Sequence, residues 1–446
     1  MQELVDRLVY LHRASIVSGT AVADAAVLLH LGQFSAITTD PPEQLSLLSQ
    51  TKFIPEVVSI LCSPSSSQVL ISETFKLLEE FTSLDETFTL EERKLALDLV
   101  NKMLDCDVPQ VCVSSKQFVE SLEFLSNLCE IYPSAAPEHL AERTDLLTVS
   151  GKLLAGSSVG WEEKLACSEL LCVVLQNSSR ARKQCDITIV LLPALQFQSE
   201  DSKVEEEEVL ENLVSAMGSV LFNSHERKIQ FGQAGLERAL ALIRQNTMLT
   251  QRLGFKLVSL LLKNCEENCR RFVDLGGLKV VFVFQVAKTL EAGPTKRSKH
   301  SMDPETKSAA LSTLYSLCVN LKAVYHQRLM TKLREPGKMD RLVELHDEFC
   351  AKVAARPQQE EGEEEDGWDS ETEYLELCEH GLAELEYVDV VLASAKLEHN
   401  DRSDDITAQI TKVVAELADR ELVLDEFGVV EEARTFELKS TLLGMV

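Results

Sequence analysis

Six polar residues recur near the ends of apolar helical patterns, and together their side chains could hold an extended peptide. They are Glu80, Asn127, Asn177, Asn223, Asn264 and Asn320. A carboxamide is both a donor and an acceptor, so an Asn can hydrogen-bond a peptide main chain whatever the peptide's side chains are. An acid in the same series favours Lys and Arg in that peptide. The alternative is that these Asn residues only cap helices and form turns, as Asn often does.

The pair Cys265 and Cys269 could ligate a metal from one face of a helix, but no second pair with zinc spacing is present in the sequence. We therefore expect these thiols to fill space in a helix and expect no metal or cofactor. The sequence also lacks a Walker A motif, a G-x-G-x-x-G loop, an H-E-x-x-H motif and a G-x-S-x-G elbow. It predicts a protein that is not an enzyme.

Charge is distributed unevenly along the 446 residues, whose net charge is −28. Residues 1–220 carry −18, residues 221–350 carry +8 and residues 351–446 carry −18. The acidic total argues against direct nucleic-acid binding. Basic partners are expected at the N-terminal half or at the C-terminal extension.

The elements that must position these residues are helices. Apolar residues recur at i, i+3, i+4 and i+7 almost throughout, and aromatic residues make up only 6% of the chain. Segments 223–236 and 264–278 share Asn, Phe and Gly at a constant offset of 41 residues, a period typical of armadillo and HEAT repeats. In both segments the Gly, Gly235 or Gly276, is expected to form the bend between the first and second helices. The fold class predicted is all-α, an armadillo/HEAT-type right-handed α-solenoid with helical capping segments.

Composition divides the chain into three parts. Residues 1–355 are predicted to form the repeat solenoid, residues 356–373 an acidic flexible linker, and residues 374–446 a helical capping region. A basic loop is expected at residues 292–299. No apolar run approaches 18 residues, so no membrane segment is expected.

Four segments resemble one known family. They are Phe272–Phe282, Ala166–Gln176, Asp340–Phe349 and Gly381–Leu382 with its flanking helix. Their order and approximate spacing are similar to those of the beta-catenin-like protein 1 family over about residues 70–395. That family usually begins with a long charged tail that bears a nuclear import signal, whereas this sequence starts at its first helices. Its own import signal is therefore not evident, unless Lys296–Lys299 or a partner supplies one.

The resemblance implies a non-enzymatic armadillo scaffold of the spliceosome, associated with the nineteen complex. It implies binding of basic, nuclear-localisation-type segments of a Myb-like splicing factor, and a location in the nucleus and also in the cytoplasm. Two alternatives stay open at this point: a nuclear import or trafficking adaptor that uses the same groove, and a catenin-like cytoskeletal scaffold that would prefer acidic partners. The sequence leaves the oligomeric state open.

Overall fold

The computed structural model describes most of the chain, namely residues 2–18, 26–27, 29–30, 53–64, 66–83, 89–195, 204–222, 224–245, 247–286, 303–355 and 376–397. In these ranges every regular element is a helix and none is a strand, which confirms the all-α prediction. The chain divides into two compact units, residues 1–222 and residues 223–446. No helix of the described ranges is long and apolar enough to cross a membrane.

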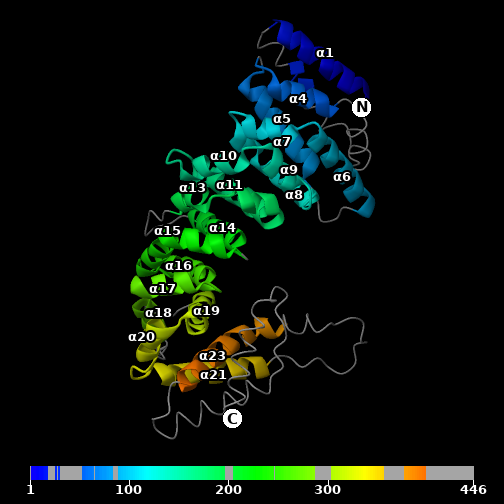
Figure 1. Ribbon diagram of the computed structural model, residues 1–446. Helices are drawn as coiled ribbons and strands as arrows, with labels where there is room; N and C mark the ends of the chain where they lie inside the picture. Colours follow the sequence, from blue (N-terminus) through cyan, green and yellow to red (C-terminus); the bar gives the residue numbers. More distant parts are fainter. Residues whose placement is uncertain are drawn as a thin grey trace, which may run out of the picture. The chain divides into compact units, whose positions relative to one another are not determined.

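Unit 1 is a succession of short and long helices (Figure 1). The α-helices are α1 (Gln2–Ser18), α4 (Phe53–Cys62), α5 (Gln68–Thr82), α6 (Leu90–Asp105), α7 (Val108–Ser114), α8 (Leu122–Ile131), α9 (Ala136–Arg143), α10 (Leu146–Ala155), α11 (Trp161–Asn177), α12 (Ser179–Gln184), α13 (Ile187–Val190) and α14 (Val204–Leu221). Helices α5, α8, α11 and α14 each follow one or two shorter helices and pack directly on one another in that order. We call these four the third helices of unit 1.

Unit 2 is also a succession of packed helices. Its helices are α15 (His225–Arg244), α16 (Met248–Leu262), α17 (Glu266–Asp274), α18 (Gly277–Val286), α19 (Pro304–Asn320), α20 (Ala323–Leu333), α21 (Lys338–Ala354) and α23 (Leu382–Leu397). Helix α16 packs on α19, and α19 packs on α23, so these three continue the third-helix pattern within unit 2. Helix α23 also packs along α21 (Figure 1).

Local sequence explains where several helices begin. Thr89 and Glu92 form a capping box at the start of α6, in which each side chain bonds the other residue's backbone N–H. The Asp303 carboxylate accepts a hydrogen bond from the Thr306 N–H at 3.0 Å, just before the proline that opens α19. Most of the stability of each helix comes from burial of its apolar side chains, since isolated helices of this length are marginal in water.

The expected bend at Gly235 is wrong. Helix α15 runs without interruption from His225 to Arg244, and Gly235 is buried in its middle. The bend at Gly276 is present, because Gly276 has φ +78° and separates α17 from α18. A left-handed φ of this size favours glycine, which has no Cβ.

At the C-terminal end of the described chain, a buried polar pair joins α21 to α23. The Nδ1 atom of His346 lies 2.7 Å from Oδ1 of Asp389, and the two residues are 4% and 0% exposed. The last described helix, α23, thus packs against both α19 and α21 and ends at Leu397. The predicted linker 356–373, the basic loop 292–299 and residues 398–446 lie outside the described residues.

Candidate protein-interaction surface

The six residues singled out in the sequence do not share one environment. Asn127 in α8 is half-buried, and its amide donates to the Glu79 carbonyl at 3.4 Å and to Thr82 Oγ1 at 3.3 Å, both in α5. It therefore ties one third helix to the preceding one. Asn177, at the end of α11, is exposed and donates to the Val173 carbonyl of its own helix at 2.9 Å.

The remaining members differ again. Asn264 is exposed in the turn after α16 and has φ +54°, a left-handed conformation that Asn tolerates better than most residues. Asn320 is only 2% exposed and donates to the Ser316 carbonyl at 2.8 Å. Glu80 is exposed on α5, and Asn223 lies outside the described residues. Asn264 thus forms part of a turn, and Asn320 lies at a buried helix end.

A different set of side chains does line up along the third helices of unit 1. Glu79 of α5, Glu123 of α8, Glu169 of α11 and Glu208 of α14 form what we call the acidic row. Glu79 is half-buried and the other three are exposed. Each member lies on a helix that packs directly on the helix carrying the next member.

Electrostatics shows that the members of the acidic row lie close to one another. Desolvation raises the pKa of the Glu79 carboxyl, and the negative charge of Glu123 raises it further. Desolvation likewise raises the pKa of Glu169, with further contributions from Glu123 and Glu208. Repulsion between like charges opposes ionisation only when the charges are close together. The shifts therefore indicate that these carboxylates form a strip of negative charge.

Two carboxamides stand one helical turn beyond members of the acidic row. Asn127 follows Glu123 by four residues, and Asn212 follows Glu208 by four residues, so each pair shares a helix face. The Asn212 amide donates to Ser168 Oγ of α11 at 3.1 Å, a contact between third helices like the one that Asn127 makes. This Glu-x-x-x-Asn spacing is the sequence signal that could have revealed the row.

The third helices of unit 2 carry a different charge pattern. Helix α16 has no acidic residue, and its Arg252 pairs with Glu305 at the start of α19, with Nε and Oε2 3.8 Å apart. The neighbouring third helices there meet through opposite charges. Among the described third helices, the strip of mutually repelling carboxylates belongs to unit 1.

Comparison with known proteins places this helical stack in a family. Residues 27–424 match a family model described as "Catenin-beta-like, Arm-motif containing nuclear". The chain belongs to this family. The beta-catenin-like proteins 1 of Mus musculus and Homo sapiens are each 26% identical to it over 385 residues, which is 79% of this chain and 66% of theirs. The match thus spans slightly less than two thirds of the length of these relatives.

A solved structure shows likeness in fold alone. The crystal structure of an engineered protein from the Northeast Structural Genomics Consortium has a TM-score of 0.52 and 14% sequence identity, covering 98% of this chain and 99% of its own. With the family match, the prediction of an armadillo-type α-solenoid is confirmed. The chain is an armadillo-motif protein of the catenin-beta-like family.

Proposed function

We propose that this catenin-beta-like protein binds basic segments of splicing factors along the acidic row and serves as a scaffold of the spliceosome. The observation that supports the proposal is the row itself, in which desolvation and the charge of Glu123 raise the pKa of Glu79, and desolvation and the charges of Glu123 and Glu208 raise that of Glu169. A Lys or Arg side chain lying between two such carboxylates relieves their repulsion. A basic segment therefore gains more from this strip than from isolated surface acids.

The spacing of the helices suggests how such a segment would lie. Packed helices are about 8–10 Å apart, and three residues of an extended chain span about 10 Å. A peptide that crosses successive third helices would therefore present a basic residue to each helix at about every third position. The amides of Asn127 and Asn212 stand beside the row, although both also hold neighbouring helices together.

The family description supports the nuclear setting of the proposal. Its description contains the word nuclear, and the resemblance implies partners that include a Myb-like splicing factor and the nineteen complex. We extend this location and these partners to the present chain as part of the proposal. Nuclear-localisation-type segments are rich in Lys and Arg, which is the chemistry the acidic row favours.

Binding of a labelled peptide with Lys at every third position, followed by fluorescence anisotropy, tests the proposal. Glu123→Gln and Glu169→Gln should each weaken binding by about two- to fivefold, as expected for exposed charge pairs. The double variant should weaken it further. Raising the salt concentration should do the same, because exposed charges are screened. Glu91→Gln, an exposed acid on α6 outside the row, is the matched control and should leave affinity unchanged.

The outcome that overturns the proposal is equal binding by the double variant and the parent protein at low salt. Peptide binding is also measured for Asn177→Ala and Asn223→Ala. If only these two variants lose binding, the peptide site lies at the helix-end Asn residues and not at the acidic row. Affinity capture from nuclear extract provides the second measurement. Splicing factors should be enriched by the parent protein and lost with the double variant, and their absence from both would contradict the spliceosomal role.

The pH dependence of the acidic row has a defined sign. Because the pKa values of Glu79 and Glu169 are raised on folding, the folded state binds protons more tightly than the unfolded state just above the ordinary carboxyl range. As the pH falls from neutral into this range, the stability of unit 1 should gain from relief of repulsion while peptide affinity decreases. Thermal unfolding and anisotropy at matched pH values check the two trends.

A further inference from the structure

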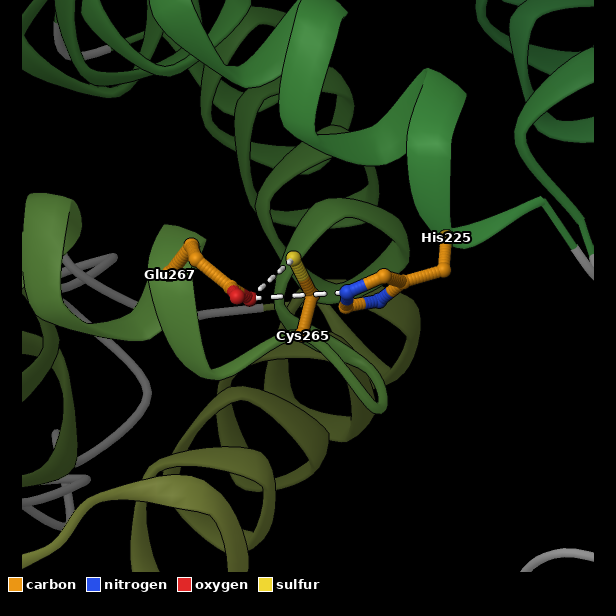
Figure 2. A group of neighbouring side chains, drawn as sticks. All are labelled: His225, Cys265 and Glu267. Atoms are coloured by element: carbon orange, nitrogen blue, oxygen red, sulfur yellow. Dashed lines mark hydrogen bonds and ion pairs between the residues drawn. The ribbon is translucent and has the colours of Figure 1, made fainter.

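Three side chains of different chemistry converge where the start of α15 meets the turn between α16 and α17 (Figure 2). His225 is the first residue of α15, Cys265 caps the N-terminus of α17, and Glu267 lies in the first turn of α17. The thiol of Cys265 is buried, whereas the imidazole of His225 and the carboxylate of Glu267 are 57% and 55% exposed. The buried sulfur is thus flanked by two side chains that reach solvent.

Two of the distances among these atoms are close to those between ligands of one tetrahedral ion. His225 Nε2 lies 3.6 Å from Glu267 Oε2, and Cys265 Sγ lies 3.8 Å from the same oxygen. One ligand atom from each of the three residues lies within 4.8 Å of those of the other two. Ligands held at about 2.0–2.3 Å from Zn²⁺ with tetrahedral angles are separated by about 3.3–3.8 Å.

A direct hydrogen bond explains the His225–Glu267 contact poorly. Hydrogen bonds from a nitrogen donor to an oxygen are about 2.7–3.2 Å long, whereas these two atoms are 3.6 Å apart. A cation placed between them would be coordinated by His225 Nε2, Glu267 Oε2 and the Cys265 thiolate at the same time. The separation is that of an ion pair, like the one between Arg252 and Glu305, and it equally suits two ligands of a shared cation.

The backbone holds the Cys265 side chain in place before any ion binds. Asn264 takes a left-handed φ of +54°, which turns the chain sharply after α16. The Cys265 N–H donates to the Leu262 carbonyl at 3.1 Å, and its own carbonyl accepts from the Cys269 N–H at 3.1 Å. The backbone N–H of Asn268 also bonds the Cys265 sulfur and favours its thiolate. A site arranged in this way loses little entropy on binding.

Cys269, the partner considered for Cys265 in the sequence, belongs to the core instead. Its thiol donates to the Leu262 carbonyl at 3.5 Å and to the Ser316 carbonyl at 3.7 Å. Burial raises the pKa of this thiol well above its usual value, which keeps it neutral. The ligand geometry thus pairs Cys265 with a residue 40 positions earlier rather than with its neighbour on the same helix.

We propose that His225, Cys265 and Glu267 bind one Zn²⁺ ion, with water in the fourth position. Thiolate, imidazole and carboxylate together suit zinc, whereas Mg²⁺ and Ca²⁺ prefer oxygen ligands alone. Binding forms the Zn–S, Zn–N and Zn–O bonds and releases the Cys265 thiol proton to solvent. The ion joins the start of α15 to the start of α17, so it connects two successive repeats independently of the acidic row.

The electrostatic surroundings determine how binding depends on the thiol. Burial raises the pKa of Cys265, and the charge of Glu267 adds to this, while Lys228 acts in the opposite direction. The Lys228 ammonium itself donates to the Lys263 carbonyl at 2.7 Å. Because a zinc-bound cysteine is a thiolate, zinc uptake should be accompanied by proton release.

Metal titration of the full chain, stripped with a chelator and desalted under reducing conditions, tests the site. Zn²⁺ is titrated in competition with a chromophoric chelator, and Co²⁺ serves as a probe whose thiolate absorption band reports a sulfur ligand. The parent protein should bind one equivalent of zinc tightly and show the band. Cys265→Ser should lose the band, and His225→Gln and Glu267→Gln should each weaken zinc binding by more than about tenfold. Cys62→Ser, which removes an exposed thiol of α4, is the matched control and should retain both signals.

The two exposed ligands keep the test valid if Cys265→Ser fails to fold, because His225→Gln and Glu267→Gln change surface side chains. Zinc should also raise the thermal midpoint of the parent protein and of Cys62→Ser, and not that of His225→Gln. The proposal is overturned if the parent protein takes up no zinc, or if a folded Cys265→Ser variant retains the cobalt band.

Discussion

Helix α15 and the pair α17 and α18 come from two copies of one sequence motif, and they differ in continuity. In the first copy a single helix passes Phe231 and Gly235 without interruption, whereas in the second the helix ends at Asp274 and restarts at Gly277. A Cβ on Gly235 would overlap the ring of Phe231, and a Cβ on Gly277 would overlap the ring of Phe272. The constant sequence offset pairs Gly235 with Gly276. The packing instead shows that Gly277 is the structural equivalent of Gly235.

Gly276 is thus one additional residue in the second copy. It has φ +78°, and a Cβ built on it meets no atom within 4 Å. The phenylalanine and the glycine beneath it keep their contact in both copies, while the inserted residue changes the direction of the chain. One residue of left-handed backbone converts a continuous helix into the two-helix form.

The largest effect is expected at Gly232, where α15 faces α17. The Asn268 amide donates to the Lys228 carbonyl at 2.7 Å and to the Leu261 carbonyl at 3.0 Å, and a Cβ on Gly232 would overlap this carboxamide. Gly232→Ala should destabilise the α15–α17 region by about 3 kcal/mol, since overpacking and loss of buried hydrogen bonds add. Hydrogen exchange of peptides from α15 to α18 measures the loss.

A double-mutant cycle sharpens this prediction. Asn268→Ala makes room for the new methyl group, so the double variant should lose less stability than the sum of the two single variants. Simple additivity would show that the two side chains do not compete for the same space. The equivalent position in the second copy is Val273, which is buried and 1% exposed, so the demand for glycine is specific to the first copy.

An intermediate effect is expected at the two glycines beneath phenylalanine rings. Gly277→Ala should cost about 2 kcal/mol, because the ring of Phe272 is buried and has little room to move. Gly235→Ala meets a similar ring but lies inside a helix, where Ala is favoured over Gly by about 1 kcal/mol. The second variant should therefore be the milder by about that amount. Equal losses, measured by the same exchange experiment, would contradict the structural equivalence of Gly235 and Gly277.

An effect similar in size to that of Gly235→Ala is expected at Gly276. Gly276→Ala should cost about 1–2 kcal/mol from left-handed backbone strain alone, because its Cβ meets no neighbour. Gly276→Asn is the control and should cost less, since Asn adopts this conformation more readily. Thermal unfolding of the two variants distinguishes them. A greater loss in the Asn variant would indicate a steric rather than a conformational cause.

The sequence predicted the fold class through apolar periodicity and the 41-residue repeat, because both depend on local spacing that the stack preserves. It could not predict that Gly235 stays helical, because a single Gly is compatible with a bend or with close packing beneath a ring. The choice depends on one extra residue, because the second copy has Gly276 and Gly277 before Leu278, whereas the first has Gly235 alone before Leu236.

The candidate sites were harder to predict than the fold. Asn residues at helix ends attracted attention by type, yet Asn264 forms a turn and Asn320 is buried. The sequence does not single out Glu123 and Glu169, because an exposed acid on a helix is ordinary, and only the packing of neighbouring helices brings them together. His225 and Cys265 are 40 residues apart, so their convergence follows from the repeat and not from any short motif.

The direct packing of each third helix on its neighbour also bears on how the units fold. Contacts between adjacent repeats join residues about 40 positions apart, so structure can start at any neighbouring pair and extend by adding one repeat at a time. Stability in such an array is a sum of neighbour terms rather than the property of one central core. A destabilising substitution at one interface between repeats should therefore first lower the protection of nearby backbone amides against hydrogen exchange. Distant repeats of the same unit should stay protected.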